Sequence, residues 1–84
     1  MSQLSQSNTN EAQLVRLGLT AREAEVLRWI SEGKSNHDIG VILGASTRTI
    51  CKHVEHIFSK LNVENRTTAA AIAFAVLNQI ADFL

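Results

Sequence analysis

The stretch from Ser35 to Leu61 restricts the fold most, because two helical patterns meet there with only a short link between them. Apolar residues at helical spacing give the first pattern one edge: Ile39, Ile42 and Leu43. A longer apolar face marks the second pattern: Ile50, Val54, Ile57, Phe58 and Leu61. This spacing predicts two consecutive amphipathic helices.

The link between the two patterns consists of Gly44, Ala45 and Ser46. Gly44 can adopt the left-handed conformation that ends a helix, and Ser46 can cap the next helix. Gly40, one turn earlier, has no side chain to obstruct a closely crossing partner helix. A link this short makes the second helix cross the first steeply, as in the helix-turn-helix motif, whose second helix lies in the DNA major groove. The chain is therefore predicted to bind DNA.

Composition limits the chain to one small all-α domain. Its 84 residues include no proline, and residues that favour helices are abundant. The single cysteine cannot form an internal disulfide, and the chain begins without a secretory signal, so we expect a cytoplasmic location. The longest apolar run, residues 69–77, is too short to cross a membrane, and no membrane association is expected.

Turn and capping residues divide the chain into four helices. Residues 1–13 are expected to be a mobile segment rich in Ser, Gln and Asn, and residues 14–84 a single domain, with a short helical turn before Gly18. Thr20 and Glu23 have capping-box spacing and predict a first helix over residues 21–32, ended by Gly33. Three further helices are expected, each with its own cap: Ser35, then Ser46 for residues 47–61, then Asn65 or Glu64 for residues 66 to about 77, with 78–84 as an extension.

Four groups of residues carry a family resemblance: Leu19-Thr20-x-Arg22-Glu23-x-Glu25-Val26-Leu27, Gly33-x-Ser35-Asn36-x-x-Ile39, Leu43-x-x-Ser46-x-x-Thr49-Ile50-x-Lys52-His53, and Lys60-Leu61-x-Val63-x-Asn65-Arg66. Together they resemble the LuxR-type (GerE-like) DNA-binding domain. The resemblance implies a four-helix, cytoplasmic, bacterial transcription regulator. It also implies that the third helix enters the major groove and that the fourth commonly mediates dimerisation. Such domains usually follow a receiver or signal-binding domain, which would lie outside this sequence.

The polar side of the third helix supplies the candidate DNA contacts. Lys52 is expected to bind a base acceptor such as guanine N7 or O6, and Arg48 a base or a phosphate. Phosphate contacts are expected from both sides of the motif: Thr47, Thr49 and His53 on the helix, Lys60 and Arg66 at its flank, and Lys34 and Ser35 at the start of the second helix. Glu55 and His56 complete the set. Glu55 could accept from cytosine N4, repel phosphate, or make no contact.

Three positions depart from the family pattern. Glu55 stands where the family frequently has a basic or amide residue. Cys51 stands where the family often has a basic or amide residue, and a small buried thiol is expected there. Cys51 projects about 140–160° away from His53 and His56 on a helical wheel, so one metal ion cannot join all three. No metal, cofactor or catalytic site is predicted, and the chain is not expected to be an enzyme. Gly40 stands where the family usually has Ala; the glycine preserves the close approach but should weaken its helix by up to about 1 kcal/mol.

The fourth helix is apolar nearly all round between residues 69 and 77. Because a surface helix needs only one apolar stripe, the surplus face predicts a partner. A weak homodimer on a palindromic site is expected, with these interface residues: Ala70, Ala71, Phe74 and Ala75. The alternative is that residues 80–84 bury this helix more deeply.

Net charge leaves a second function open. The eight basic and eight acidic residues cancel, whereas DNA-binding domains are usually basic. Basic residues nonetheless outnumber acidic ones by two over residues 47–66: Arg48, Lys52, Lys60 and Arg66 against Glu55 and Glu64. The leading prediction is a sequence-specific DNA-binding transcription regulator. The alternative is a helix-turn-helix-shaped protein-interaction module that sequesters another regulator through its fourth helix.

Overall fold

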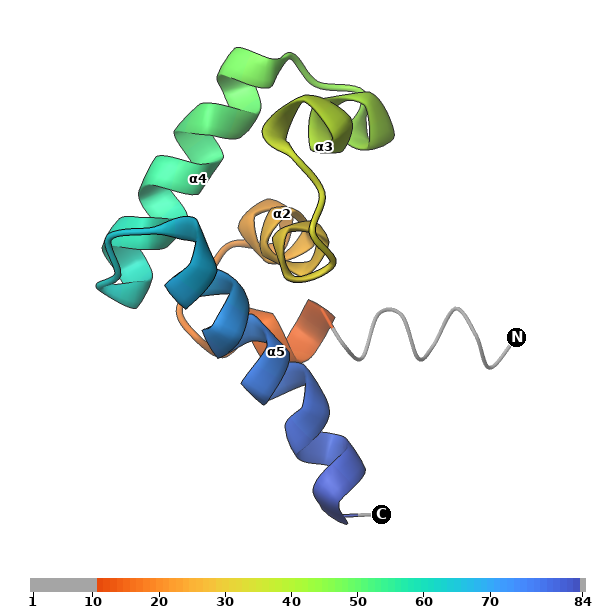
Figure 1. Ribbon diagram of the computed structural model, residues 1–84, viewed down its shortest axis with the longest axis vertical. Helices are drawn as coiled ribbons and strands as arrows, with labels where there is room; N and C mark the ends of the chain where they lie inside the picture. The colour runs from red at the N-terminus through yellow and green to blue at the C-terminus, as the bar shows by residue number, and fades with distance from the viewer. Residues whose placement is uncertain (1–10, 84) are drawn as a thin grey trace.

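The computed structural model of the chain describes residues 11–83, with the side chains of residues 11–78. Helical backbone over residues 11–15 is followed by α2 (Ala21–Ser31), α3 (Asn36–Leu43), α4 (Thr47–Leu61) and α5 (Arg66–Phe83), as Figure 1 shows. Over this range there is no strand, and the predicted all-α fold is confirmed. Most of the predicted mobile segment, residues 1–13, lies outside the described residues. Between residues 11 and 83, every helix is too short or too polar to cross a membrane.

Side-chain caps begin the four longer helices at the predicted residues. Thr20 and Glu23 form the complete capping box: the Glu23 amide donates to the Thr20 hydroxyl at 3.1 Å, and the Thr20 amide donates to the Glu23 carboxylate at 3.0 Å. The other three caps each accept one backbone amide: Ser35 from Asp38 at 3.1 Å, Ser46 from Thr49 at 3.1 Å, and Asn65 from Thr68 at 2.8 Å. These local bonds explain where α2 to α5 start.

The turn between α3 and α4 depends on two glycines. Gly44 has φ of 70°, the left-handed conformation predicted for it, and the Ala45 amide donates to the Gly40 carbonyl at 2.9 Å. A Cβ on Gly40 would lie 2.6 Å from the Ala45 carbonyl oxygen. The close approach at Gly40 is therefore made by the turn, not by a crossing helix as predicted, and an alanine would not preserve it without a backbone shift. The two helices leave this turn in clearly different directions (Figure 1).

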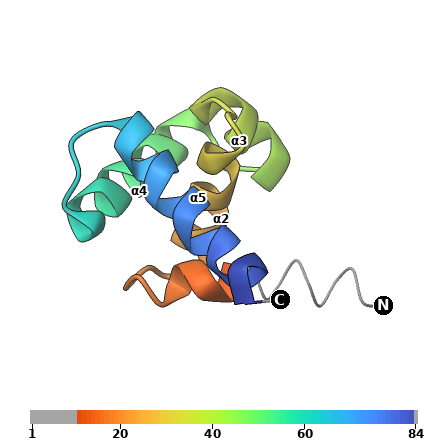
Figure 2. The ribbon, with the colours of Figure 1, turned by 60° about the horizontal axis from the view of Figure 1, so that its bottom comes forward.

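α2 lies inside the fold, with α4 packed against it from one direction and α5 from another (Figure 2). One apolar core joins all the helices: Leu14, Leu19, Ala24, Val26, Leu27, Ile30, Ile39, Ile50, Val54, Ile57, Ala69 and Ala73. Each large side chain buried there contributes about 1.5–3 kcal/mol to folding. The inward faces predicted for the two helices are confirmed: α2 buries Val26, Leu27 and Ile30, and α4 buries Ile50, Val54 and Ile57.

Two expectations need correction or extension. Ile42 was expected on the apolar edge of α3, but its side chain is 44% exposed. Since α3 has only eight residues, the core covers just the arc that holds Ile39 and Leu43, which are one turn apart. α5 continues to Phe83, so the predicted extension beyond residue 77 is helical. Residues 80–83 therefore prolong α5 along its axis and do not fold back to cover it (Figure 1).

Candidate nucleic-acid interface

α4 has a buried arc and an exposed arc on opposite sides. The buried arc holds the three core residues of the helix, at positions 50, 54 and 57. The exposed arc holds polar side chains throughout: Arg48, Lys52, Glu55, His56 and Ser59. Thr47 and Thr49 are also exposed at the start of the helix, and His53 is half-buried beside the arc. The structure thus gathers most of the predicted DNA contacts of α4 on one accessible surface.

Arg48 and Lys52 are the cations of this surface. Both side chains are exposed, and among residues 11–83 neither makes an ion pair or a side-chain hydrogen bond. They lie four residues apart, so they project from the same side of α4 on successive turns. A long, unpaired cation on each of two turns can reach base edges or phosphates without breaking an internal contact.

The beginning of α3 forms the second part of the surface. Lys34 and Ser35 are exposed, and the Ser35 hydroxyl caps α3 by accepting the Asp38 amide. The first backbone amides of a helix carry partial positive charge and favour an anion. Asp38 already supplies one negative charge to this first turn, which weakens its attraction for phosphate. A phosphate contact here therefore depends on the ammonium group of Lys34 as well as on the helix end.

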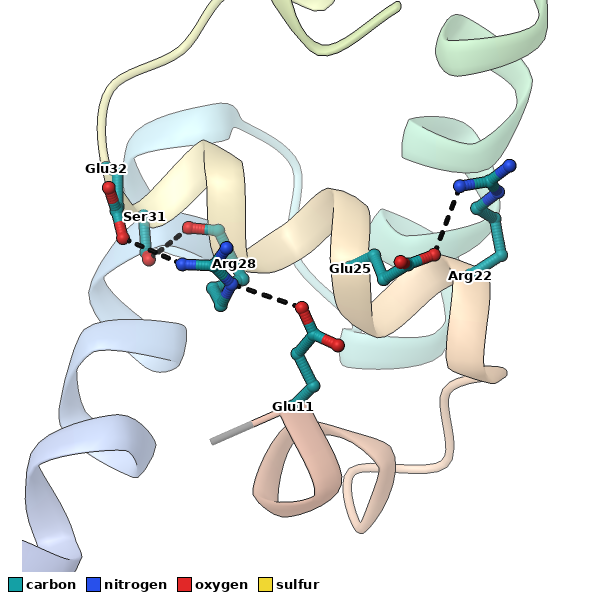
Figure 3. A network of polar contacts seen from close by, with 6 residues as sticks. All are labelled: Glu11, Arg22, Glu25, Arg28, Ser31 and Glu32. Carbon is teal, nitrogen blue, oxygen red and sulfur yellow. Dashed lines mark hydrogen bonds and ion pairs between the residues drawn. The ribbon is translucent and has the colours of Figure 1, made fainter. Parts of the chain in front are cut away.

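The acidic residues around α2 are paired inside the protein. Figure 3 shows Arg28 bonded to Glu11 at 3.2 Å and to Glu32 at 3.0 Å, and Arg22 bonded to Glu25 at 3.1 Å. The Arg28 guanidinium also lies 4.2 Å from the centre of the Trp29 ring. These contacts balance positive and negative charge locally. The neutral total charge of the chain is thus compatible with a basic surface on α4.

Lys60 does not extend into solvent as the other α4 cations do. Its Nζ donates to the Glu23 carboxylate at 2.7 Å, and His56 Nδ1 lies 3.9 Å from the other carboxylate oxygen. Glu23 is buried, and burial alone would raise the pKa of its carboxyl. The hydrogen bonds from Lys60 and from the Thr20 amide outweigh burial and leave that pKa below its usual value. The C-terminal turn of α4 is therefore fixed to the start of α2.

Arg66 is also engaged inside the protein. Its guanidinium donates to the Asn36 side-chain oxygen at 2.7 Å and to the Lys34 carbonyl at 2.6 Å. The Asn36 amide group in turn donates to the Cys51 sulfur at 3.4 Å. Cys51 is half-buried rather than fully buried. Sequence analysis gave no role to Asn36, since its partners lie 15 and 30 residues away and no local spacing links them.

Among the side chains of residues 11–78, no three His, Cys, Asp or Glu groups come together in a way that could hold a metal ion. A shallow pocket near the short first helix is lined by Glu11, Ala12, Val15, Ala21 and Glu25. Both of its carboxylates are already paired with the arginines of α2. This pocket therefore offers no charged group for a ligand.

α5 has one packed side and one outer side. Ala69 and Ala73 are buried, and Ala70 packs partly against the core. Ala71, Phe74 and Ala75 are exposed, with Phe74 63% exposed. Positions 71, 74 and 75 share one helix face, and the C-terminal half of α5 extends beyond the other helices (Figure 1). Three of the four predicted interface residues thus lie on an accessible apolar stripe.

A short capped helix, a glycine turn and a longer helix with an exposed polar arc together define a helix-turn-helix domain. The chain belongs to the luxR family of bacterial regulatory proteins, whose model matches residues 17–73, and this is a family of DNA-binding regulators and not of enzymes. The resemblance stated from the motifs is confirmed.

Named relatives agree with this assignment. The chain is 47% identical over 58 residues to the transcriptional activator protein SolR of Ralstonia nicotianae, covering 69% of this chain and 25% of that protein. It is 43% identical over 63 residues to the transcriptional activator protein AnoR of Acinetobacter nosocomialis, covering 75% of this chain and 26% of that protein. It is 42% identical over 66 residues to the transcriptional regulatory protein LiaR of Bacillus subtilis, covering 79% of this chain and 31% of that protein. The matched part thus spans only about a quarter to a third of these relatives. No solved structure matches the chain significantly.

Proposed function

We propose that this domain is a sequence-specific DNA-binding regulator of transcription whose α4 lies in the major groove. The observation that carries the proposal is the exposed arc of α4, where Arg48 and Lys52 have no intramolecular partner among the described residues. Membership of the luxR family and the regulatory functions of the named relatives support the same role. Such a regulator acts where the bacterial chromosome lies, so we place it in the cytoplasm.

The individual contacts follow from where each side chain is held. Lys52 and Arg48 face base edges, and Glu55 and His56 adjoin them and influence which bases are accepted. Phosphates are bound around this centre by Thr47, Thr49, His53, Lys34 and Ser35. We leave Lys60 and Arg66 out of this contact set, because their charged groups already donate to acceptors inside the protein at 2.6–2.7 Å.

Selection of bound sequences from random DNA, followed by titration at several salt concentrations, tests the proposal. Binding should weaken steeply with salt, because lysine and arginine displace counterions from phosphate. Lys52→Ala should lower affinity by about 5- to 150-fold and relax preference at one base pair. Arg16→Ala is the matched control, since Arg16 is exposed on the turn after the short first helix. If Lys52→Ala and Arg48→Ala both bind like the parent domain, α4 does not read DNA.

We also propose a weak homodimer that pairs the outer stripe of α5 and occupies a palindromic site. The stripe is small, so association in free solution should be limited and DNA should reinforce it. Ala75→Glu places a charge in the stripe and should abolish dimerisation while leaving the monomer folded. Ala12→Glu, at an exposed alanine outside α5, is the control. Sedimentation with and without DNA measures both, and a strict monomer that fills the two half-sites independently would contradict the dimer.

The sensing domain that usually accompanies domains of this kind remains an expectation from the resemblance.

A domain that binds no DNA even at low salt would contradict the proposed function, and would instead favour a protein-interaction module acting through α5.

A further inference from the structure

Asn36 connects three helices through its two side-chain atoms. Its oxygen accepts from Arg66, the first residue of α5, at 2.7 Å. Its nitrogen donates to Cys51, in the second turn of α4, at 3.4 Å. Asn36 itself is the first residue of α3. The three side chains are all half-buried, so the bonds are partly shielded from water.

The same cluster reaches the two places where DNA contact is proposed. Arg66 donates a second bond, at 2.6 Å, to the carbonyl of Lys34, whose ammonium group is a proposed phosphate contact. Cys51 directly precedes Lys52, the proposed base contact. A single chain of hydrogen bonds thus runs from the backbone of the phosphate-binding turn, through Arg66 and Asn36, to the base-reading turns of α4.

Arg66 also stands at an electrostatically unfavourable place. It is the first residue of α5 and lies next to the first turn of α3, and the N-terminal end of a helix carries partial positive charge that disfavours a cation. Two short bonds to well-placed oxygens keep the guanidinium there. Reorienting the guanidinium toward a phosphate would give up one or both of these bonds.

We propose that Asn36 and Arg66 are positioning residues for DNA binding, which hold the base-reading turns of α4 in register with the phosphate-binding start of α3. This inference rests on the proposed function. It assigns Arg66 a role through Asn36 and Lys34, not as a phosphate ligand. Misplacement of a recognition group by as little as an ångström is enough to weaken a well-oriented contact.

The salt dependence of DNA binding separates the two roles. Lys34→Met removes an exposed cation and should reduce the slope of log K against log salt by about 0.9, the value for one phosphate contact. Arg66→Met should reduce affinity by about 5- to 50-fold with the parent slope retained, since it removes no phosphate contact. Measurements are made well below the unfolding temperature of each variant, so that lost folding does not imitate lost binding. A slope reduction for Arg66→Met equal to that of Lys34→Met would overturn the inference.

Asn36→Asp is a second variant that keeps the acceptor for Arg66, removes the donor to Cys51 and adds a negative charge beside Arg66. It should relax base preference at the pair read by Lys52, which a purely structural loss would not do. In a double-variant cycle, Asn36→Ala should add little to the effect of Arg66→Met, because both interrupt the same chain of bonds. Fully additive losses, or parent-like base preference in Asn36→Asp, would overturn the inference while DNA binding by the parent domain still stands. Absence of DNA binding by the parent domain itself would instead overturn the proposed function, and this inference with it.

Discussion

Glu23→Gln tests the contact that joins the start of α2 to the end of α4. The Glu23 side chain is 5% exposed and accepts from Lys60 at 2.7 Å and from the Thr20 amide at 3.0 Å. Glutamine keeps the shape and a neutral acceptor but loses the charge. Hydrogen bonds to charged groups contribute about 1.5–3 kcal/mol, and neutral ones about 0.5–1.5 kcal/mol. The Lys60 side chain is 38% exposed, so its ammonium group can return to water. The stability lost in Glu23→Gln should therefore be near the difference between a charged and a neutral hydrogen bond, about 1.5 kcal/mol.

The loss should depend on pH in one direction. Burial raises the pKa of Glu23, but the bonds from Lys60 and Thr20 lower it further, so the folded-state pKa lies below the usual value of 4.5. A depressed carboxyl pKa stabilises the fold above the unfolded-state pKa, and that stabilisation is lost as pH falls through the folded-state value. The parent domain and Glu23→Gln should therefore differ in stability at pH 7, and the difference should shrink as the pH falls through the folded-state pKa of Glu23.

Thermal unfolding followed by circular dichroism measures the effect. A loss of about 1.5 kcal/mol corresponds to a Tm reduced by about 6–12 °C in a domain of this size. Glu25→Gln is the matched control, because Glu25 forms an exposed ion pair with Arg22 that should contribute well under 1 kcal/mol. A Tm for Glu23→Gln within 2 °C of the parent at pH 7, or a difference that does not shrink as the pH is lowered, would refute this account of the contact.

Two further substitutions test the local geometry. Thr20→Ala removes the hydroxyl that caps α2 and should cost about 1 kcal/mol of stability without altering base preference. An unchanged denaturation midpoint would argue against the capping role. Gly44→Ala forces a Cβ into the left-handed conformation at φ 70° and should cost about 1–2 kcal/mol, measured by urea unfolding. A Gly44→Ala domain as stable as the parent would mean that the turn relaxes to a conformation open to any residue.

The sequence predicts the helix boundaries well because capping is a local event. Thr20, Ser35 and Ser46 each bond to an amide three residues further on, so spacing alone identifies them. The core of α4 is equally predictable, since Ile50, Val54 and Ile57 recur at helical spacing. The polar side of α4 lies opposite its core, so the same helical spacing also predicts which residues of α4 form the candidate DNA-binding surface.

What the sequence could not predict are contacts between distant residues and the depth of packing. Lys60 and Glu23 are 37 residues apart, and Arg66 and Asn36 are 30 apart, so no periodicity links them. The sequence therefore predicts both cations as phosphate contacts and gives no sign of their internal partners. The exposure of Ile42 has a related cause, because apolar spacing shows which residues share a helix face but not how wide an arc the neighbouring helices cover.

The two arcs of α4 give folding and recognition separate sets of residues. Substitutions at exposed positions away from structural contacts usually change stability by no more than about 0.5 kcal/mol. Positions 48, 52 and 55 belong to the exposed arc and contribute nothing to the buried core. Under the proposed function, a library randomised at these three positions should consist mostly of folded domains with differing DNA preferences. A few substitutions on the exposed arc of α4 can therefore redirect such a regulator to a new operator while its buried core stays the same.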